Sequence, residues 1–253
     1  MVASRFIPAG LGWHRDLPDA RDYSLDHPAV ITVLAPLRRR DTSLPRRIDL
    51  REDDDGVYFL SPEDQGCRNA SAAFACLSLI EYFERRTRGH TFEASVSFVH
   101  AMACKLDRVA DNSAVGIRST LKAIRRFGVP PPDLQSLPPH PEADGDDASL
   151  FGYVSDMREL IYFRLDRVNQ SGHQTLDYLK TLLASQFPVA FGFTVPRSMT
   201  DEAEIPYRPG FDSYRGGQAV VAVGYDDRKL PGNQGAVLFR SSWGTQWGQS
   251  GYG

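Results

Sequence analysis

The chain has 253 residues, 42% of them hydrophobic, so it is long enough to bury a large core and too ordinary in composition to be fibrous or disordered. Its 29 Lys and Arg residues against 32 Asp and Glu give a formal net charge of -3, which argues against a nucleic-acid-binding protein. The first residues hold no apolar run long enough for a signal peptide or a membrane span, so we expect a cytoplasmic protein that makes no membrane contact.

The first half of the chain predicts an extended lead-in followed by helices. Residues 1–47 are rich in Pro and Arg and predict a segment that packs on the outside of the rest, with one short strand at residues 30–34. From residue 73 apolar side chains recur at helical spacing, Asn69 can cap this helix, and Gly89 can end it. Further helical patterns cover about residues 93–106 and 113–127.

The second half of the chain predicts mainly strands. Residues 138–149 (PPHPEADGDDAS) are acidic and rich in helix breakers, which is typical of a mobile surface loop. One helix is expected at residues 175–185, and strands are expected at residues 161–168, 189–195, 219–225 and 236–239. A helical half followed by a strand-rich half indicates an α+β protein with a cleft between two lobes.

Three separated blocks resemble the papain family of cysteine peptidases, in bacterial members without a long propeptide. They are IDLR at residue 48 with DQG at residue 64, GGQAVVAVGY at residues 216–225, and SSWGTQWGQSGY at residues 241–252. The blocks occur in family order and span nearly the whole chain. The resemblance implies a two-lobe papain-like fold, with a mainly helical lobe at residues 48–150, an antiparallel β-barrel-like lobe at residues 151–253, and a cleft between them.

The same resemblance assigns the catalytic positions to residues that lack the family's chemistry. Such peptidases attack an amide with a thiolate that a neighbouring imidazole activates, an amide side chain orients that imidazole, and a Gln holds the oxyanion. Here the nucleophile position is Ser71, the base position is Gln218 and the orienting position is Ser241, while Gln65 matches the oxyanion donor. Because a carboxamide has no basic nitrogen, Gln218 cannot accept a proton at neutral pH.

We therefore expect a pseudopeptidase that holds a peptide segment or a partner protein in its vestigial cleft without cutting it. Ala72 replaces the bulky aromatic that usually follows the nucleophile, and Ala114 replaces a Gly that lies close to the substrate backbone. The residues expected to line the cleft are Gln65, Ser71, Ala72, Ala114, Gln218 and Trp243.

Two alternatives remain open. In one, the chain is a hydrolase or transferase in which Ser71 acts with an unrecognised base. In the other, it is an accessory subunit whose sheet has an open edge near Gly253, because the family continues through further strands there, and a partner chain fills that edge.

The remaining cysteines and histidines predict structural roles. Cys67 is expected to be a packed or loop thiol. Cys76 and Cys104 lie on apolar helical faces and are expected in the core as reduced thiols. His100 is expected to be structural. No histidine falls in the strand that should supply a base; the six are His14, His27, His90, His100, His140 and His173. No set of these residues has metal-ligand spacing, so we expect no metal and no cofactor.

Overall fold

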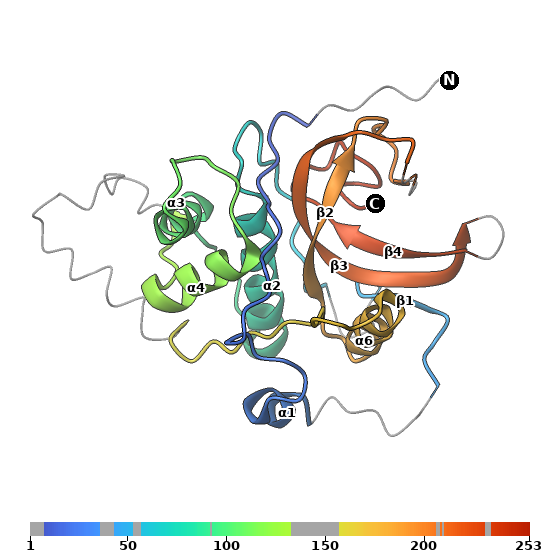
Figure 1. Ribbon diagram of the computed structural model, residues 1–253, viewed down its shortest axis with the longest axis horizontal. Coiled ribbons are helices and arrows are strands. Elements are labelled where there is room, and N and C mark those ends of the chain that lie inside the picture. Colours follow the sequence, from blue (N-terminus) through green and yellow to red (C-terminus); the bar gives the residue numbers. More distant parts are fainter. Residues whose placement is uncertain are drawn as a thin grey trace, which may run out of the picture.

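The computed structural model describes residues 8–35, 43–52, 57–91, 93–132, 157–205, 208, 210–230 and 234–253. Helices α2, α3 and α4 gather on one side of the molecule, and an antiparallel sheet lies on the other, with α6 beside it (Figure 1). This arrangement confirms the expected α+β architecture. The predicted acidic loop at residues 138–149 lies outside the described residues, as does His140.

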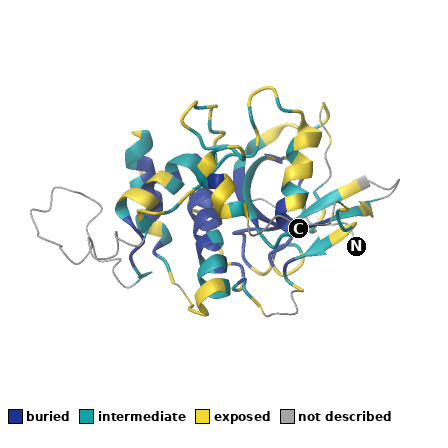
Figure 2. Cartoon of the chain, turned by 90° about the horizontal axis from the view of Figure 1, so that it is seen from below, coloured by how far each residue is buried: buried dark blue, intermediate teal, exposed yellow. Residues whose placement is uncertain are grey.

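Helix α2 (Ser71–Arg88) is the central element of the helical lobe, and much of it is buried (Figure 2). It ends at Gly89, which adopts φ 67°, a left-handed conformation that glycine tolerates well. Its N-cap is Ala70, so the predicted cap by Asn69 is wrong. The Asn69 side chain instead accepts a hydrogen bond from Leu11 N at 3.1 Å and donates one to the carbonyl of Asn112 at 2.9 Å.

Helices α3 (Val96–Asp107) and α4 (Ile117–Phe127) pack against α2. Ser95 caps α3 by accepting a hydrogen bond from Phe98 N at 3.3 Å. The three helices share an apolar cluster because each turns its buried stripe toward the others. Its buried members are Ala73, Cys76, Leu77, Ile80, Val99, Ile124 and Val129.

The sheet is built around the long strand β3 (Tyr214–Leu230), which pairs antiparallel with β1 (Arg47–Asp49), β2 (Val189–Pro196) and β4 (Gln234–Arg240). Ala222 pairs with Val189 of β2 and also with Phe239 of β4, so these two strands lie on opposite edges of β3. The predicted strands at residues 189–195, 219–225 and 236–239 are therefore confirmed. Helix α6 (Gly172–Ala184), which a Ser171 capping box begins, packs on β2 and β3.

Two predicted strands are wrong. Residues 30–34 belong to helix α1 (Pro28–Leu34), which Pro28 and the His27 side chain begin, with Val30 on the buried side. Residues 161–168 form no strand, because this stretch bonds to the N-terminal segment instead of to a strand: Arg164 N donates to the carbonyl of Tyr23 at 2.8 Å.

The helical lobe and the sheet share one apolar core. Buried side chains of α2, including Ala72, Ala75 and Tyr82, belong to the same cluster as Val221 and Val223 of β3. A buried guanidinium reinforces the junction, because Arg240 of β4 donates to Ser78 Oγ of α2 at 2.8 Å. The lobes are thus parts of one folding unit.

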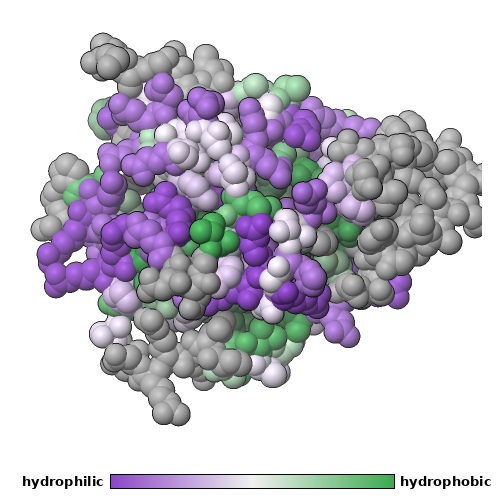
Figure 3. Space-filling view, turned by 180° about the vertical axis from the view of Figure 1, so that it is seen from behind, coloured by the Kyte–Doolittle hydropathy of each residue, from purple (hydrophilic) through white to green (hydrophobic). Residues whose placement is uncertain are grey.

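None of the described helices combines the length and the apolar character that crossing a bilayer requires. The face opposite to that of Figure 1 is mainly hydrophilic, with small apolar patches where its residues are described (Figure 3).

The carboxyl of Glu81 in α2 makes the stability of the fold pH-dependent. Burial and the nearby Glu63 raise the pKa of Glu81 to about 7. The folded state therefore holds this proton more tightly than the unfolded chain, where Glu titrates near about 4.3. The stabilising contribution of the protonated Glu81 carboxyl is complete below about pH 4.3 and is lost as the pH rises through about 7.

We predict that Glu81→Gln raises the free energy of unfolding by about 1 to 3 kcal/mol at pH 8 and changes it little at pH 4, because the amide mimics the protonated acid. Denaturant unfolding at both pH values measures this. Glu202→Gln at an exposed site is the control and should have no pH-dependent effect. Equal stabilisation at the two pH values contradicts the prediction.

Candidate functional site

The structure brings the predicted nucleophile and base positions together. Ser71 is the first residue of α2, and Gln218 lies on the neighbouring stretch of β3; both are 0% exposed. The backbone N–H of Ala219, the residue after Gln218, donates to Ser71 Oγ at 3.1 Å. The start of α2 thus meets β3 where the resemblance implied a catalytic pair.

Three side chains form a buried hydrogen-bonded cluster that we call the amide network: Gln65, Gln218 and Ser242. Gln218 Nε2 donates to Gln65 Oε1 at 2.9 Å and to Ser242 Oγ at 3.1 Å. Ser242 Oγ donates to Gln65 Oε1 at 2.6 Å, which closes the ring. The network is electrically neutral and joins the loop before α2 to the sheet.

The amide network leaves one acceptor unused. Gln218 Oε1 is buried and has no hydrogen-bond partner among the described residues. A buried carbonyl oxygen without a donor costs about 1 to 3 kcal/mol.

Sequence reasoning assigned the orienting position to Ser241, and in the described structure no hydrogen bond joins that side chain to Gln218. Its hydroxyl donates to the carbonyl of Gly251 at 2.9 Å and accepts from Trp243 N at 3.3 Å. The next residue, Ser242, supplies the contact instead. Adjacent residues of an extended chain point to opposite sides, and the sequence alone did not reveal which of the two hydroxyls faces the cleft.

Two other expected cleft residues have packing roles. Ala72 is fully buried in the core that the helices share with the sheet. Trp243 is 6% exposed and stands at 4.7 Å, edge to face, from Trp247, which makes it part of the wall behind the amide network.

The hydroxyl of Ser71 has one side-chain hydrogen bond in the described part of the chain. Its hydroxyl bonds to Ala219 N, and no histidine or thiol in the described ranges bonds to it. Two thiols are also unsuited to take the place of the nucleophile. Cys67 is exposed in a loop, and burial raises the pKa of Cys76.

One Cys and one His do meet, in α3, as a neutral pair. Cys104 Sγ lies 3.6 Å from His100 Nε2. Burial raises the pKa of Cys104 and lowers the pKa of His100, which opposes the thiolate and imidazolium forms that a catalytic pair needs. Both residues are buried, which confirms the prediction of a core position for Cys104.

The cleft is occupied by the protein's own N-terminal residues 10–16, which we call the strap. The strap passes between α4 and the sheet (Figure 1). The carbonyl of Leu11 accepts a hydrogen bond from Gln65 Nε2 at 2.7 Å and a longer one from the backbone N of Ser71 at 3.5 Å. Gln65 is the donor that the resemblance assigns to an oxyanion, so a peptide carbonyl of the chain itself lies against that donor.

Backbone contacts hold the next strap residues on both sides. Gly12 N and Trp13 N each donate to the carbonyl of Gly217 at 3.1 Å. On the opposite side Val115 N donates to the carbonyl of Gly12 at 3.2 Å, and Trp13 pairs with Val115 in parallel. The strap backbone thus approaches the chain at Val115, the residue after Ala114.

Glycines make room for the strap. A Cβ on Gly192 would come within 2.1 Å of the Trp13 ring, and one on Gly217 would come within 2.2 Å of the Trp13 carbonyl oxygen. Gly12 itself has φ +135° and lies against the backbone of Asn69. The expectation that the N-terminal segment packs only on the outside is therefore corrected: residues 10–16 fill the cleft.

Carboxylates anchor the last residue of the strap and the segment that follows it. Asp16 Oδ2 accepts from Arg118 N at 3.2 Å, and the Arg118 guanidinium donates to Asp22 Oδ1 at 2.7 Å. Among the described residues no group of three or more His, Cys, Asp or Glu side chains is arranged to hold a metal ion.

Comparisons with known proteins agree with this geometry. A family model described as papain family cysteine protease matches residues 44–253. An uncharacterized peptidase C1-like protein of Acanthamoeba polyphaga mimivirus is 24% identical over 97% of this chain and 81% of its own length. The crystal structure of xylellain, a cysteine protease from Xylella fastidiosa, superposes with a TM-score of 0.66 at 25% identity, covering 100% of this chain and 90% of that one. Procathepsin B S9 from Trypanosoma congolense shares the fold, with a TM-score of 0.63 at 20% identity over 96% of this chain and 80% of that one.

We predict that Gly192→Ala dislodges the strap, because the new methyl group overlaps the Trp13 ring. The free energy of unfolding should fall by about 1 to 3 kcal/mol, and trypsin should cut after Arg15 faster than in the wild type. Gly172→Ala is the matched control, since a Cβ there meets nothing within 4 Å. If the two variants are equally stable and equally resistant to trypsin, the strap is not held by this contact.

Proposed function

Because this chain belongs to the papain family of cysteine proteases, we propose that it is a non-catalytic member whose cleft holds a peptide segment without cutting it. The observation that carries this proposal is the Leu11 carbonyl, which two oxyanion-type donors hold beside a hydroxyl that has no base. The ligand would be a peptide or a partner protein that competes with the strap.

The chemistry supports binding over cleavage. A serine hydroxyl attacks an amide only when a neighbouring group removes its proton, and the carboxamide of Gln218 cannot do so. Loss of a nucleophile or base from a protease triad lowers turnover on the order of a millionfold. The donors that remain, Gln65 and the N–H of Ser71, still orient a carbonyl, and that function is sufficient for binding.

The covalent link between the strap and the rest of the chain determines how strongly a second peptide can bind in the cleft. A segment on a short linker to its own site acts at an effective concentration on the order of millimolar. The apparent affinity of a competing peptide is then its intrinsic affinity multiplied by the fraction of molecules whose cleft is empty. The strap would therefore act as an internal competitor, and a partner would need contacts beyond the cleft or a means of releasing Trp13.

A second candidate function is the binding of a partner chain at the edge of the sheet, and the backbone pairing of the C-terminal residues favours it. Gly253 pairs with Phe239 of β4 through two backbone hydrogen bonds of 2.8 and 3.1 Å. A strand from another chain could continue this antiparallel pairing along β4. Co-purification of a partner, with a solution mass above 28.2 kDa, would support such a hetero-oligomer.

We predict that a fluorescent peptide with the sequence of residues 8–18 binds the Trp13→Ala variant at least about tenfold tighter than the wild type, because the weakened strap competes less. Fluorescence anisotropy measures this. The same peptide with Ala in place of its Trp is the control and should not bind. Failure of the peptide to bind a folded Trp13→Ala variant contradicts the proposed peptide site.

We also predict that Ser71 is unreactive. A fluorophosphonate probe should leave the wild type unlabelled, and mass spectrometry of peptide mixtures incubated with the protein should reveal no new termini. The Ser71→Ala variant is the matched control. Labelling that appears in the wild type and disappears in this variant would instead support the Ser71 nucleophile.

A further inference from the structure

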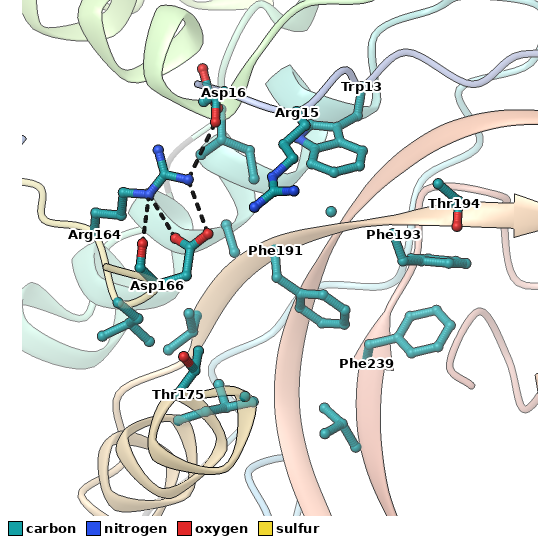
Figure 4. A pocket seen from close by; sticks show the side chains of 18 of the residues that line it. Trp13, Arg15, Asp16, Arg164, Asp166, Thr175, Phe191, Phe193, Thr194 and Phe239 are labelled. Carbon is teal, nitrogen blue, oxygen red and sulfur yellow. Dashed lines mark hydrogen bonds and ion pairs between the residues drawn. The ribbon is translucent and has the colours of Figure 1, made fainter. Parts of the chain in front are cut away.

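A cavity of about 890 Å³ opens beside the strap, along β2 and α6. Trp13 of the strap forms part of its wall (Figure 4). Its volume falls within the range of roughly 300 to 1,000 Å³ that small-molecule sites usually occupy.

The wall formed by the sheet is apolar and aromatic. Phe191 and Phe193 of β2 and Phe239 of β4 all line the cavity (Figure 4). The ring centroids of Phe193 and Phe239 lie 5.7 Å apart, so the rings form one continuous surface. Leu176 and Leu179 of α6 add aliphatic side chains, and Leu176 is 41% exposed. Water leaves such a surface readily when an apolar chain replaces it.

The charged end of the cavity is largely neutralised. Arg164 Nε donates to Asp166 Oδ1 at 2.7 Å, and Arg118 Nε donates to Asp22 Oδ1 at 2.7 Å. These two cations already have acidic partners, so they offer little attraction to a further anion.

Arg15 differs from these two arginines. It belongs to the strap, and its guanidinium reaches toward the cavity above Phe191 (Figure 4). No hydrogen bond or ion pair joins this guanidinium to the described residues. Arg15 is thus an unpaired cation above an aromatic wall, which is a suitable arrangement for a ligand with an apolar body and one negative charge.

We propose that this cavity binds a medium- or long-chain monocarboxylate, with the hydrocarbon tail along Phe191, Phe193 and Phe239 and the carboxylate on Arg15. The nearby carboxylates of Asp16, Asp22 and Asp166 disfavour a more highly charged head such as a phosphate monoester. Since Arg15 and Trp13 both belong to the strap, the ligand also holds the strap in the cleft.

The test compares dodecanoate with dodecanol, each below its aggregation limit, by isothermal titration calorimetry with the full chain. Dodecanoate should bind at one site, at least about tenfold tighter than the neutral alcohol, because it alone forms a charge-assisted bond with Arg15. Arg15→Gln should remove this preference and leave the affinity for dodecanol unchanged. Leu176→Asp should weaken both ligands.

Arg208→Gln is the matched control, because Arg208 also lines the cavity and has no ion pair with a described residue. It should retain the preference for dodecanoate. The proposal is overturned if the wild type binds both ligands equally, if neither ligand binds saturably, or if Arg208→Gln and not Arg15→Gln removes the preference. None of these outcomes depends on peptide binding in the cleft, which the strap peptide tests separately.

Discussion

A hydrogen bond between two side-chain amides, those of Gln65 and Gln218, crosses the boundary between the helical lobe and the sheet, and the architecture of the cleft depends on it. Gln65 is held in turn by Ser242, and it directs its Nε2 toward the carbonyl of Leu11. A charged pair at this buried place would carry a large desolvation cost, whereas neutral amides need only satisfied hydrogen bonds. The network therefore joins the lobes and presents donors, but it has no group that can transfer a proton.

The strap completes this arrangement. A peptide carbonyl in the oxyanion position, an indole over Gly192 and backbone bonds on both sides make residues 10–16 a fitted part of the structure. Trp13, Arg15 and Asp16 of the strap also line the neighbouring cavity, so cleft and cavity share this element. Occupancy of either space is expected to alter the other, since any ligand that favours the seated strap also disfavours a competing peptide.

Local patterns in the sequence predicted most of the elements, and the failures have definite physical reasons. The helix predicted from the spacing between Ala73 and Phe83 and the strand predicted at residues 219–225 are confirmed, because side-chain periodicity is a local property. Residues 161–168 have the composition of a strand, but Arg164 N bonds to Tyr23, far away in the chain. Residues 30–34 contain β-branched side chains, which favour a strand, but Pro28 favours the start of a helix and these residues belong to α1.

The sequence by itself determined the family and the functional groups at the key positions, because Ser71 carries a hydroxyl and Gln218 a carboxamide without a basic nitrogen in any fold. Only the tertiary structure decided which neighbours those groups meet. Gln65 and Gln218 are 153 residues apart in the chain, and Ser242 takes the place that was expected for Ser241. The occupation of the cleft by residues 10–16 was likewise hidden, since it rests on backbone hydrogen bonds and on the space above glycines, neither of which leaves a periodic pattern in the sequence.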